Sequence, residues 1–288
     1  MDEIREVLNK YDESYISNNL ISIDDINKFA ATFYKDVAEI YDCITRVKNA
    51  ERNPTGFALY DAPILGLLIR VWKLLKEIIR YYEADNAEII SILERPLIEA
   101  SVTATYLLQN DHSVIEDYRK CSYKDRLRIL RDLQQGSPFF ETKAGKRLLT
   151  SINEKIKLEN LTTNDFKVQK QNGWKLQGKR FYEIFKKVVG EQLYTCTYGM
   201  MSESIHGSWN ESMDFCLHIN EDGTFSTFPF YHSADIRYVS PTLRFCNTPY
   251  RLWLKRIEAD DKYLLDILDW VERVNITLFR KFDEKYDG

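Results

Sequence analysis

Residues 194–210 carry four hydroxyl or imidazole groups at a spacing of four, on Tyr194, Tyr198, Ser202 and His206. Side chains four apart lie on one face of an α-helix, so the spacing predicts a row of hydrogen-bonding groups. Histidine is the usual general acid or base near neutral pH, and Gly207 directly after it favours a helix end at this point. The row predicts either a chemical site or a polar seam inside a helical core.

The two interpretations differ in what surrounds His206. As a general acid or base, its imidazole would need a partner, such as Ser202 one turn away or Arg95 or Glu99 on a facing helix. In the alternative, the histidine is buried and its polar atoms are satisfied by tyrosine and serine hydroxyls. The sequence leaves both interpretations open.

Arg95 and Glu99 form a second candidate pair, on a helix expected over residues 86–109. They are four apart and share a helix face, beside Pro96, which is expected to kink the helix. They either form an ion pair with each other at the surface, which adds little to stability, or bind a ligand together.

The sequence lacks the common signatures of cofactor and metal sites. It has no glycine-rich phosphate loop, no nucleophile elbow, no His-Glu-x-x-His motif and no paired Cys/His spacing. We therefore predict no cofactor and no metal.

Composition and charge narrow the function classes. The chain has 288 residues, of which 44% are hydrophobic and 29% charged, and this balance excludes a disordered protein. Although the net charge is −4, residues 112–189 carry 18 basic and 9 acidic side chains. This asymmetry favours an anionic partner such as RNA, or else pairing of the basic segment with its own acidic flanks.

Targeting signals are also absent. The first residues are acidic and amphipathic, unlike a secretory signal, and no apolar run approaches the roughly 20 residues that span a bilayer. We expect a cytoplasmic protein with no membrane partner.

Hydrophobic periodicity predicts a mainly α fold, a multi-helix bundle with a small β-hairpin near residues 214–230. Helices are expected over residues 2–19, 24–50, 63–82, 86–109, 113–135, 143–157, 180–189, 250–257 and 260–282. An irregular stretch is expected over residues 158–171, a loop over 172–179, and breaks at Pro241 and Pro249. No linker argues for two domains. We expect one domain over residues 1–288, with N-terminal helices (1–60), a core bundle (61–210), and the hairpin with the C-terminal helices (211–288).

Three pieces of the chain together resemble the uncharacterised bacterial helical family known as domain of unknown function family 5677. They are the helix with Arg95 and Glu99, the loop Trp-Lys-Leu-Gln-Gly-Lys ending at Lys179, and the row that ends in His206-Gly207. The resemblance covers about residues 65–210. It implies an α-helical fold and one polar cluster without a known reaction, made of Arg95, Glu99, Lys179, Tyr198, Ser202 and His206.

This family in turn resembles the HEPN helical proteins, many of which are RNA-cleaving toxins or phage-defence effectors, and which often pair their sites across a homodimer. Their usual signature is an arginine followed four to six residues later by a histidine on one late helix. Here Gly199, Met200 and Met201 stand before His206 instead. A ribonuclease assignment therefore needs Arg95 to supply the cation from another helix.

The first hypothesis is a metal-independent ribonuclease of defence or toxin type. In it, the catalytic residues are His206 as general acid or base, Arg95 as a phosphate-binding cation and Ser202 as an orienting group. Lys179 also binds phosphate, and Glu99, Tyr198 and Tyr194 complete the ligand-binding residues. The second hypothesis is a binding or regulatory module without catalysis, in which the same cluster holds a small anion or stabilises the bundle.

Overall fold

The computed structural model describes residues 13–286 of the chain. These residues are mainly helical, and their only sheet is a two-stranded hairpin, so the predicted fold class is confirmed. The helix expected over residues 2–19 falls largely on residues 1–12, which lie outside the described residues, and α2 covers Glu13–Asn19. No helix of the described part is long and apolar enough to cross a bilayer.

The chain divides into two compact units. Unit 1 combines Met1–Gln109 with Phe185–Gly288, and unit 2 is Asn110–Ile184. Unit 1 thus contains residues from both ends of the chain. The boundaries near residues 60 and 210 that the sequence suggests both fall inside unit 1. That the whole chain acts as one domain stays a prediction.

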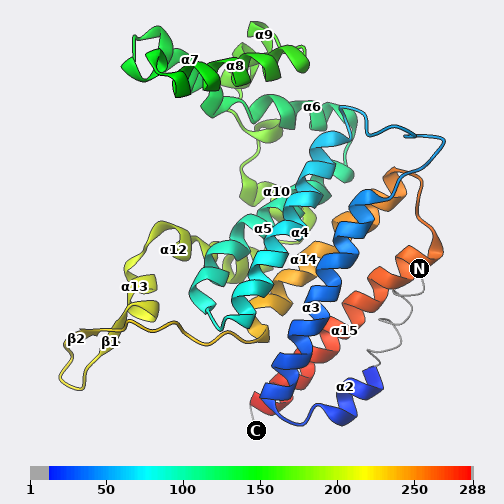
Figure 1. Ribbon diagram of the computed structural model, residues 1–288, viewed down its shortest axis with the longest axis vertical. Coiled ribbons are helices and arrows are strands. Elements are labelled where there is room, and N and C mark those ends of the chain that lie inside the picture. Colours follow the sequence, from blue (N-terminus) through cyan, green and yellow to red (C-terminus); the bar gives the residue numbers. More distant parts are fainter. Residues whose placement is uncertain (1–12, 287–288) are drawn as a thin grey trace. The chain divides into compact units, whose positions relative to one another are not determined.

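Five long helices form the body of unit 1: α3 (Ile23–Arg46), α4 (Ala62–Glu83), α5 (Ala87–Leu108), α14 (Ile236–Arg256) and α15 (Lys262–Tyr286). Helix α5 packs against α4 and α14, α3 packs against α4, and α15 packs against α3 and α14 (Figure 1). Ser22 caps α3 through a reciprocal capping box with Asp25. The central position of α5 matters for function, because it carries Arg95 and Glu99.

Buried tyrosines hold the centre of this bundle. The rings of Tyr41 and Tyr250 stack with centroids 4.1 Å apart. The Tyr250 hydroxyl donates to the backbone carbonyl of Leu68 at 2.8 Å, and the Tyr41 hydroxyl donates to Oδ1 of Asn247 at 3.2 Å. Since both hydroxyls have partners, these large side chains are buried without leaving those polar groups unsatisfied.

Helix α14 corrects one expectation. The sequence predicts breaks at Pro241 and Pro249, yet α14 runs through both. A proline lacks the N–H that would bond the carbonyl four residues earlier, so the helix loses local stability at each position. Packing of α14 against four other long helices of unit 1 offsets this loss.

Short elements connect α5 and α14 along the chain of unit 1. After α10 (Phe181–Val188), which spans the unit boundary, come α11 (Gln192–Tyr194), a π-helical turn η3 (Thr195–Gly199), α12 (Met201–His206) and α13 (Trp209–Phe215). The hairpin comes next, with β1 (Leu217–Ile219) antiparallel to β2 (Phe225–Thr227) and Leu217 opposite Thr227. The predicted hairpin is therefore confirmed.

Unit 2 contains α6 (His112–Cys121), α7 (Lys124–Gln134), the 3₁₀ turn η1 (Pro138–Glu141), α8 (Lys143–Leu158), α9 (Thr163–Gln171) and the 3₁₀ turn η2 (Leu176–Gly178). Two expectations were wrong. The single helix over residues 113–135 is interrupted after Cys121, and the stretch expected to be irregular contains α9. A capping box between Thr162 and Asp165 starts α9, and this Thr-x-x-Asp signal stands in the sequence.

The loop over residues 172–179 is attached to α6 by one carboxylate. Asp117 accepts from the backbone N–H of Gln177 at 2.6 Å and from the side-chain amide of Gln169. Gln177 has a left-handed φ of 52°, which a residue other than glycine seldom adopts. The bond to Asp117 helps to hold this loop, which ends at Lys179.

Candidate functional site

Arg95 and Glu99 lie on one face of α5, and Tyr198 of η3 lies against both. The Arg95 guanidinium carbon is 4.5 Å from the centroid of the Tyr198 ring, a cation–π contact. The Tyr198 hydroxyl donates to Oε2 of Glu99 at 3.1 Å. In the described residues Arg95 and Glu99 form no ion pair with each other, so they are not the simple surface pair that the sequence allows. We call these three residues the Arg95 cluster.

Burial differs within the Arg95 cluster. Tyr198 is 5% exposed, Arg95 is half-buried and Glu99 is exposed. Nη1 of Arg95 is buried and has no hydrogen-bond partner among the described residues. A buried charged donor without an acceptor is costly, so the Arg95 cluster has an unused capacity to bind an acceptor oxygen.

The pKa of Tyr198 reflects the same surroundings. Burial raises it to about 12, and the neighbouring Glu99 carboxylate adds to the rise, while Arg95 opposes it. Tyr198 is therefore protonated at neutral pH. In this state it acts as a hydrogen-bond donor and not as a base.

Aromatic rings support Tyr198 from behind. The ring of Phe185 is 5.4 Å from that of Tyr194 and 6.3 Å from that of Tyr198, and the two tyrosine rings are 5.6 Å apart. Tyr194 thus belongs to the packing that fixes Tyr198.

The row from Tyr194 to His206 is not one regular α-helix. Its first half passes through the π turn, in which the Met200 N–H donates to the Thr195 carbonyl five residues earlier. Exposure rises along the row, from buried Tyr198 through partly buried Ser202 to exposed His206. The π turn left no sign in the sequence pattern, because a spacing of four fits a regular helix equally well.

Ser202 and His206 occupy α12, which packs against α5. The Ser202 hydroxyl donates to the Tyr198 carbonyl at 3.4 Å, a bond within the helix itself. His206 is the last residue of α12, and Gly207 ends the helix with a left-handed φ of 60°, as the sequence predicts. Because His206 is exposed, it is not the buried histidine of the alternative interpretation.

The structure brings together part of the predicted site. Arg95, Glu99 and Tyr198 are in contact, Tyr194 packs beside them, and Ser202 lies one turn later. No hydrogen bond joins His206 to Arg95 or Glu99 among the described residues. Lys179 belongs to unit 2, where its Nζ donates to the Gln177 carbonyl at 3.5 Å. The functional roles of all these residues stay predictions.

Sequence reasoning missed Glu94, the neighbour of Arg95. Its side chain is 7% exposed, and its Oε1 accepts from the Thr242 hydroxyl of α14 at 2.9 Å. Burial raises the pKa of Glu94 to about 8, so this carboxyl is largely protonated at neutral pH. Its position could have indicated this burial, because Glu94 lies on the apolar face of α5 with Leu97 and Ile90.

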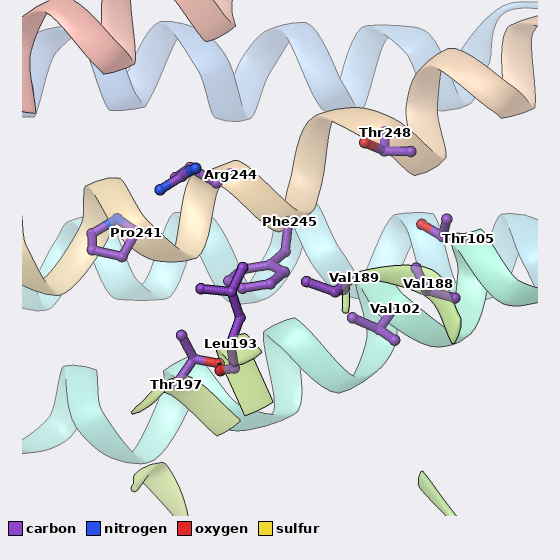
Figure 2. A pocket seen from close by; sticks show the side chains of 10 residues that line it. All are labelled: Val102, Thr105, Val188, Val189, Leu193, Thr197, Pro241, Arg244, Phe245 and Thr248. Atoms are coloured by element: carbon purple, nitrogen blue, oxygen red, sulfur yellow. The ribbon is translucent and has the colours of Figure 1, made fainter. Parts of the chain in front are cut away.

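A cavity of about 230 Å³ lies farther along α5, lined by residues of α5, of α14 and of the segment from the end of α10 to η3. Figure 2 shows its lining side chains, which are mostly apolar: Val102, Thr105, Val188, Val189, Leu193, Thr197, Pro241, Arg244, Phe245 and Thr248. Val102 is three residues after Glu99 on α5, and no residue of the Arg95 cluster lines this cavity. Among the described residues that line it, Arg244 is the one with a charge.

Metal ligands do not gather in the described part of the chain. Residues 13–286 contain no group of three or more histidine, cysteine, aspartate or glutamate side chains that could hold a metal ion.

Comparison with known proteins identifies the family. Residues 61–225 match the family described as "Family of unknown function (DUF5677)", and this match includes Arg95, Glu99, Lys179 and the whole row from Tyr194 to His206. No curated protein and no solved structure matches the chain significantly. Because the matched region is more than half of the chain, the protein belongs to the family of unknown function DUF5677.

Proposed function

We propose that the Arg95 cluster binds a phosphate group of RNA and that the chain acts on RNA. The observation that carries this proposal is the state of Arg95. Its guanidinium is held over the Tyr198 ring, and its buried Nη1 lacks an acceptor within the described residues. A phosphate oxygen would supply that acceptor in a charge-assisted hydrogen bond, after a small adjustment of the side chain.

The charge of the second unit supports RNA as the anion. Exposed lysines and arginines without an acidic partner among the described residues occur along α7 and α8: Lys124, Arg128, Lys143, Lys146, Arg147, Lys155 and Lys157. Pairing with acidic groups accounts for other basic residues of this unit, since Arg119 contacts Glu159 and Lys120 contacts Asp165, each at 2.9 Å. The remaining positive charge favours a polyanion over a single small anion.

His206 is the residue that we propose for catalysis. It is exposed, and it is the last residue of a helix that packs against α5. Cleavage would begin as a base takes the proton of a ribose 2′-hydroxyl and the oxygen attacks the adjacent phosphorus. The bond from phosphorus to the 5′-oxygen then breaks, and an acid protonates the leaving oxygen. Arg95 would stabilise the charge on the phosphorane.

The test uses the full chain with a fluorescent single-stranded RNA, and it measures binding and cleavage separately. Arg95→Ala should weaken binding by about tenfold, since a charge-assisted hydrogen bond is lost. Arg70→Ala is the matched control, because Arg70 is exposed on α4 and lines none of the cavities described here. If Arg95→Ala binds RNA as tightly as the unmodified protein, the proposal is wrong.

Catalysis is tested with His206→Ala, which should abolish cleavage and any toxicity on expression, while binding is retained. His218→Ala is the control, because His218 is an exposed histidine of the hairpin.

The second hypothesis, a binding module without catalysis, has its own support in the missing contact between His206 and the Arg95 cluster. It would be favoured if binding depends on Arg95 while neither variant nor unmodified protein cleaves RNA.

A further inference from the structure

A second cavity, separate from the Arg95 cluster, lies between α14 and α15. Its volume is about 290 Å³, and the side chains that matter for its chemistry are Pro241, Arg244, Asn275, Ile276, Phe279 and Arg280. Pro241 and Arg244 also line the cavity of Figure 2, so α14 borders both. None of these residues belongs to the Arg95 cluster, so ligand binding in this second cavity does not depend on the proposed function.

The inner wall of this second cavity has an unsatisfied acceptor. Asn275 is 3% exposed, its Nδ2 donates to the Ser240 carbonyl at 3.0 Å, and its Oδ1 is buried with no partner among the described residues. Exchanging the two amide atoms would set oxygen against the Ser240 carbonyl oxygen, so the free atom is the acceptor. A ligand N–H or O–H in the cavity would satisfy it, which removes the cost of a buried lone acceptor.

The outer edge carries two cations. Arg244 of α14 and Arg280 of α15 are both exposed, and neither forms an ion pair within the described residues. Two guanidinium groups that different helices contribute to one cavity favour a phosphate or carboxylate, because each offers paired N–H donors in a planar fork.

Apolar side chains also line this second cavity. Ile276 and Phe279, both partly buried on α15, face the cavity together with Pro241. A phenyl ring at the wall of a cavity is a surface on which a planar heterocycle can stack. A ligand that meets all three requirements has a planar body with an N–H donor and an anionic group at its other end.

We propose that this cavity binds a free nucleoside monophosphate. Its base stacks on Phe279 and donates an N–H to Oδ1 of Asn275, and its phosphate lies between Arg244 and Arg280. Each of the four common bases carries an N–H donor, so these contacts do not select one base. The volume is near the lower end of the range of small-molecule sites, which suits a mononucleotide better than a larger ligand.

Isothermal titration calorimetry of the full chain with AMP, GMP, CMP and UMP tests this proposal. At least one nucleotide should bind saturably, and ribose 5-phosphate, inorganic phosphate and the corresponding nucleoside should each bind about tenfold more weakly or not at all. Binding of inorganic phosphate as tight as that of the nucleotide would overturn the proposal, as would the absence of nucleotide binding.

Variants locate the nucleotide. Arg280→Ala and Phe279→Leu should each weaken binding about tenfold, whereas Arg70→Ala and Arg95→Ala should not. Arg280 is exposed, so its removal should leave the melting temperature unchanged and isolate the effect on binding. Binding that is lost in Arg95→Ala but kept in Arg280→Ala would place the nucleotide at the Arg95 cluster and contradict this proposal. Loss of RNA binding alone in Arg95→Ala concerns only the proposed function.

Discussion

At the scale of single residues, α5 carries a cation and a neutral acid side by side. Arg95 is held by the Tyr198 ring, while Glu94 points into the interface with α14 and bonds to Thr242. The two neighbours differ in direction, since consecutive residues of a helix lie about 100° apart. The structure therefore assigns Glu94 to the packing of unit 1 and Arg95 to its surface chemistry.

Glu94 should make the stability of the protein depend on pH. Its folded pKa of about 8 lies above its ordinary value of 4.5, so between these values the folded state holds a proton that the unfolded state has released. The free energy of unfolding should then fall as the pH rises from about 5 to about 8, by a few kcal/mol at most, and level off above that. Urea unfolding at a series of pH values measures this dependence.

Glu94→Gln should remove most of this slope, because the amide still accepts from Thr242 but does not ionise. Glu88→Gln, a change of the same kind at the start of α5, should leave the slope as it is. Equal slopes in the unmodified protein and in Glu94→Gln would show that Glu94 is ionised in the folded state.

At the scale of elements, the end of α12 depends on one glycine. Gly207 has a φ of 60°, and a Cβ built there meets no atom within 4 Å. Gly207→Ala should therefore destabilise the protein only through the strain in its backbone, by about 1 kcal/mol.

Gly66→Ala should have the opposite effect, because Gly66 lies inside α4 without a left-handed φ and also has free space. It should stabilise the protein by about 0.5–1 kcal/mol.

Chemical denaturation of both glycine variants, followed by the circular dichroism signal of the helices, measures whether each change raises or lowers the free energy of unfolding. If Gly207→Ala is as stable as the unmodified protein, α12 does not end in the left-handed turn. His206 would then be placed differently from what the structure shows.

The elements also show what periodicity reveals and what it does not. The stripes of α3, α4 and α5 predicted helices whose ends lie within a few residues of those observed, and the alternation around Leu217 predicted the hairpin. Only the end of helix α14, after Pro249, was predicted, because Pro241 and Pro249 oppose a helix locally and only contacts with other helices override them. Long-range packing of this kind leaves no trace in a short window of sequence.

The candidate site could be predicted only in part, for a similar reason. Spacing placed Arg95 and Glu99 on one face, and resemblance grouped them with Tyr198, which the structure confirms as a contact. The burial of Glu94 and the acceptor of Asn275 depend on which residues meet across helices. No spacing within one helix contains that information.

At the scale of the whole molecule, charge is unevenly distributed along the chain. Residues 112–189 hold twice as many basic as acidic side chains, and the rest of the chain is acidic. If unit 2 contacts the RNA backbone, the logarithm of the binding constant should fall linearly with the logarithm of salt concentration. The slope counts phosphate contacts, with about 0.7 per contact for a single strand.

Neutralising three exposed lysines of α8 should reduce that slope. Changing Lys143, Lys146 and Lys155 to glutamine removes up to three contacts, which corresponds to a slope smaller by about 2. The same change at Lys255, Lys262 and Lys285, which are exposed residues of unit 1, alters the net charge equally and should leave the slope nearly unchanged. Fluorescence anisotropy with one RNA over a range of salt concentrations measures both. Equal slopes in the two triple variants would mean that RNA senses only the net charge, and unit 2 would then have no specific part in binding.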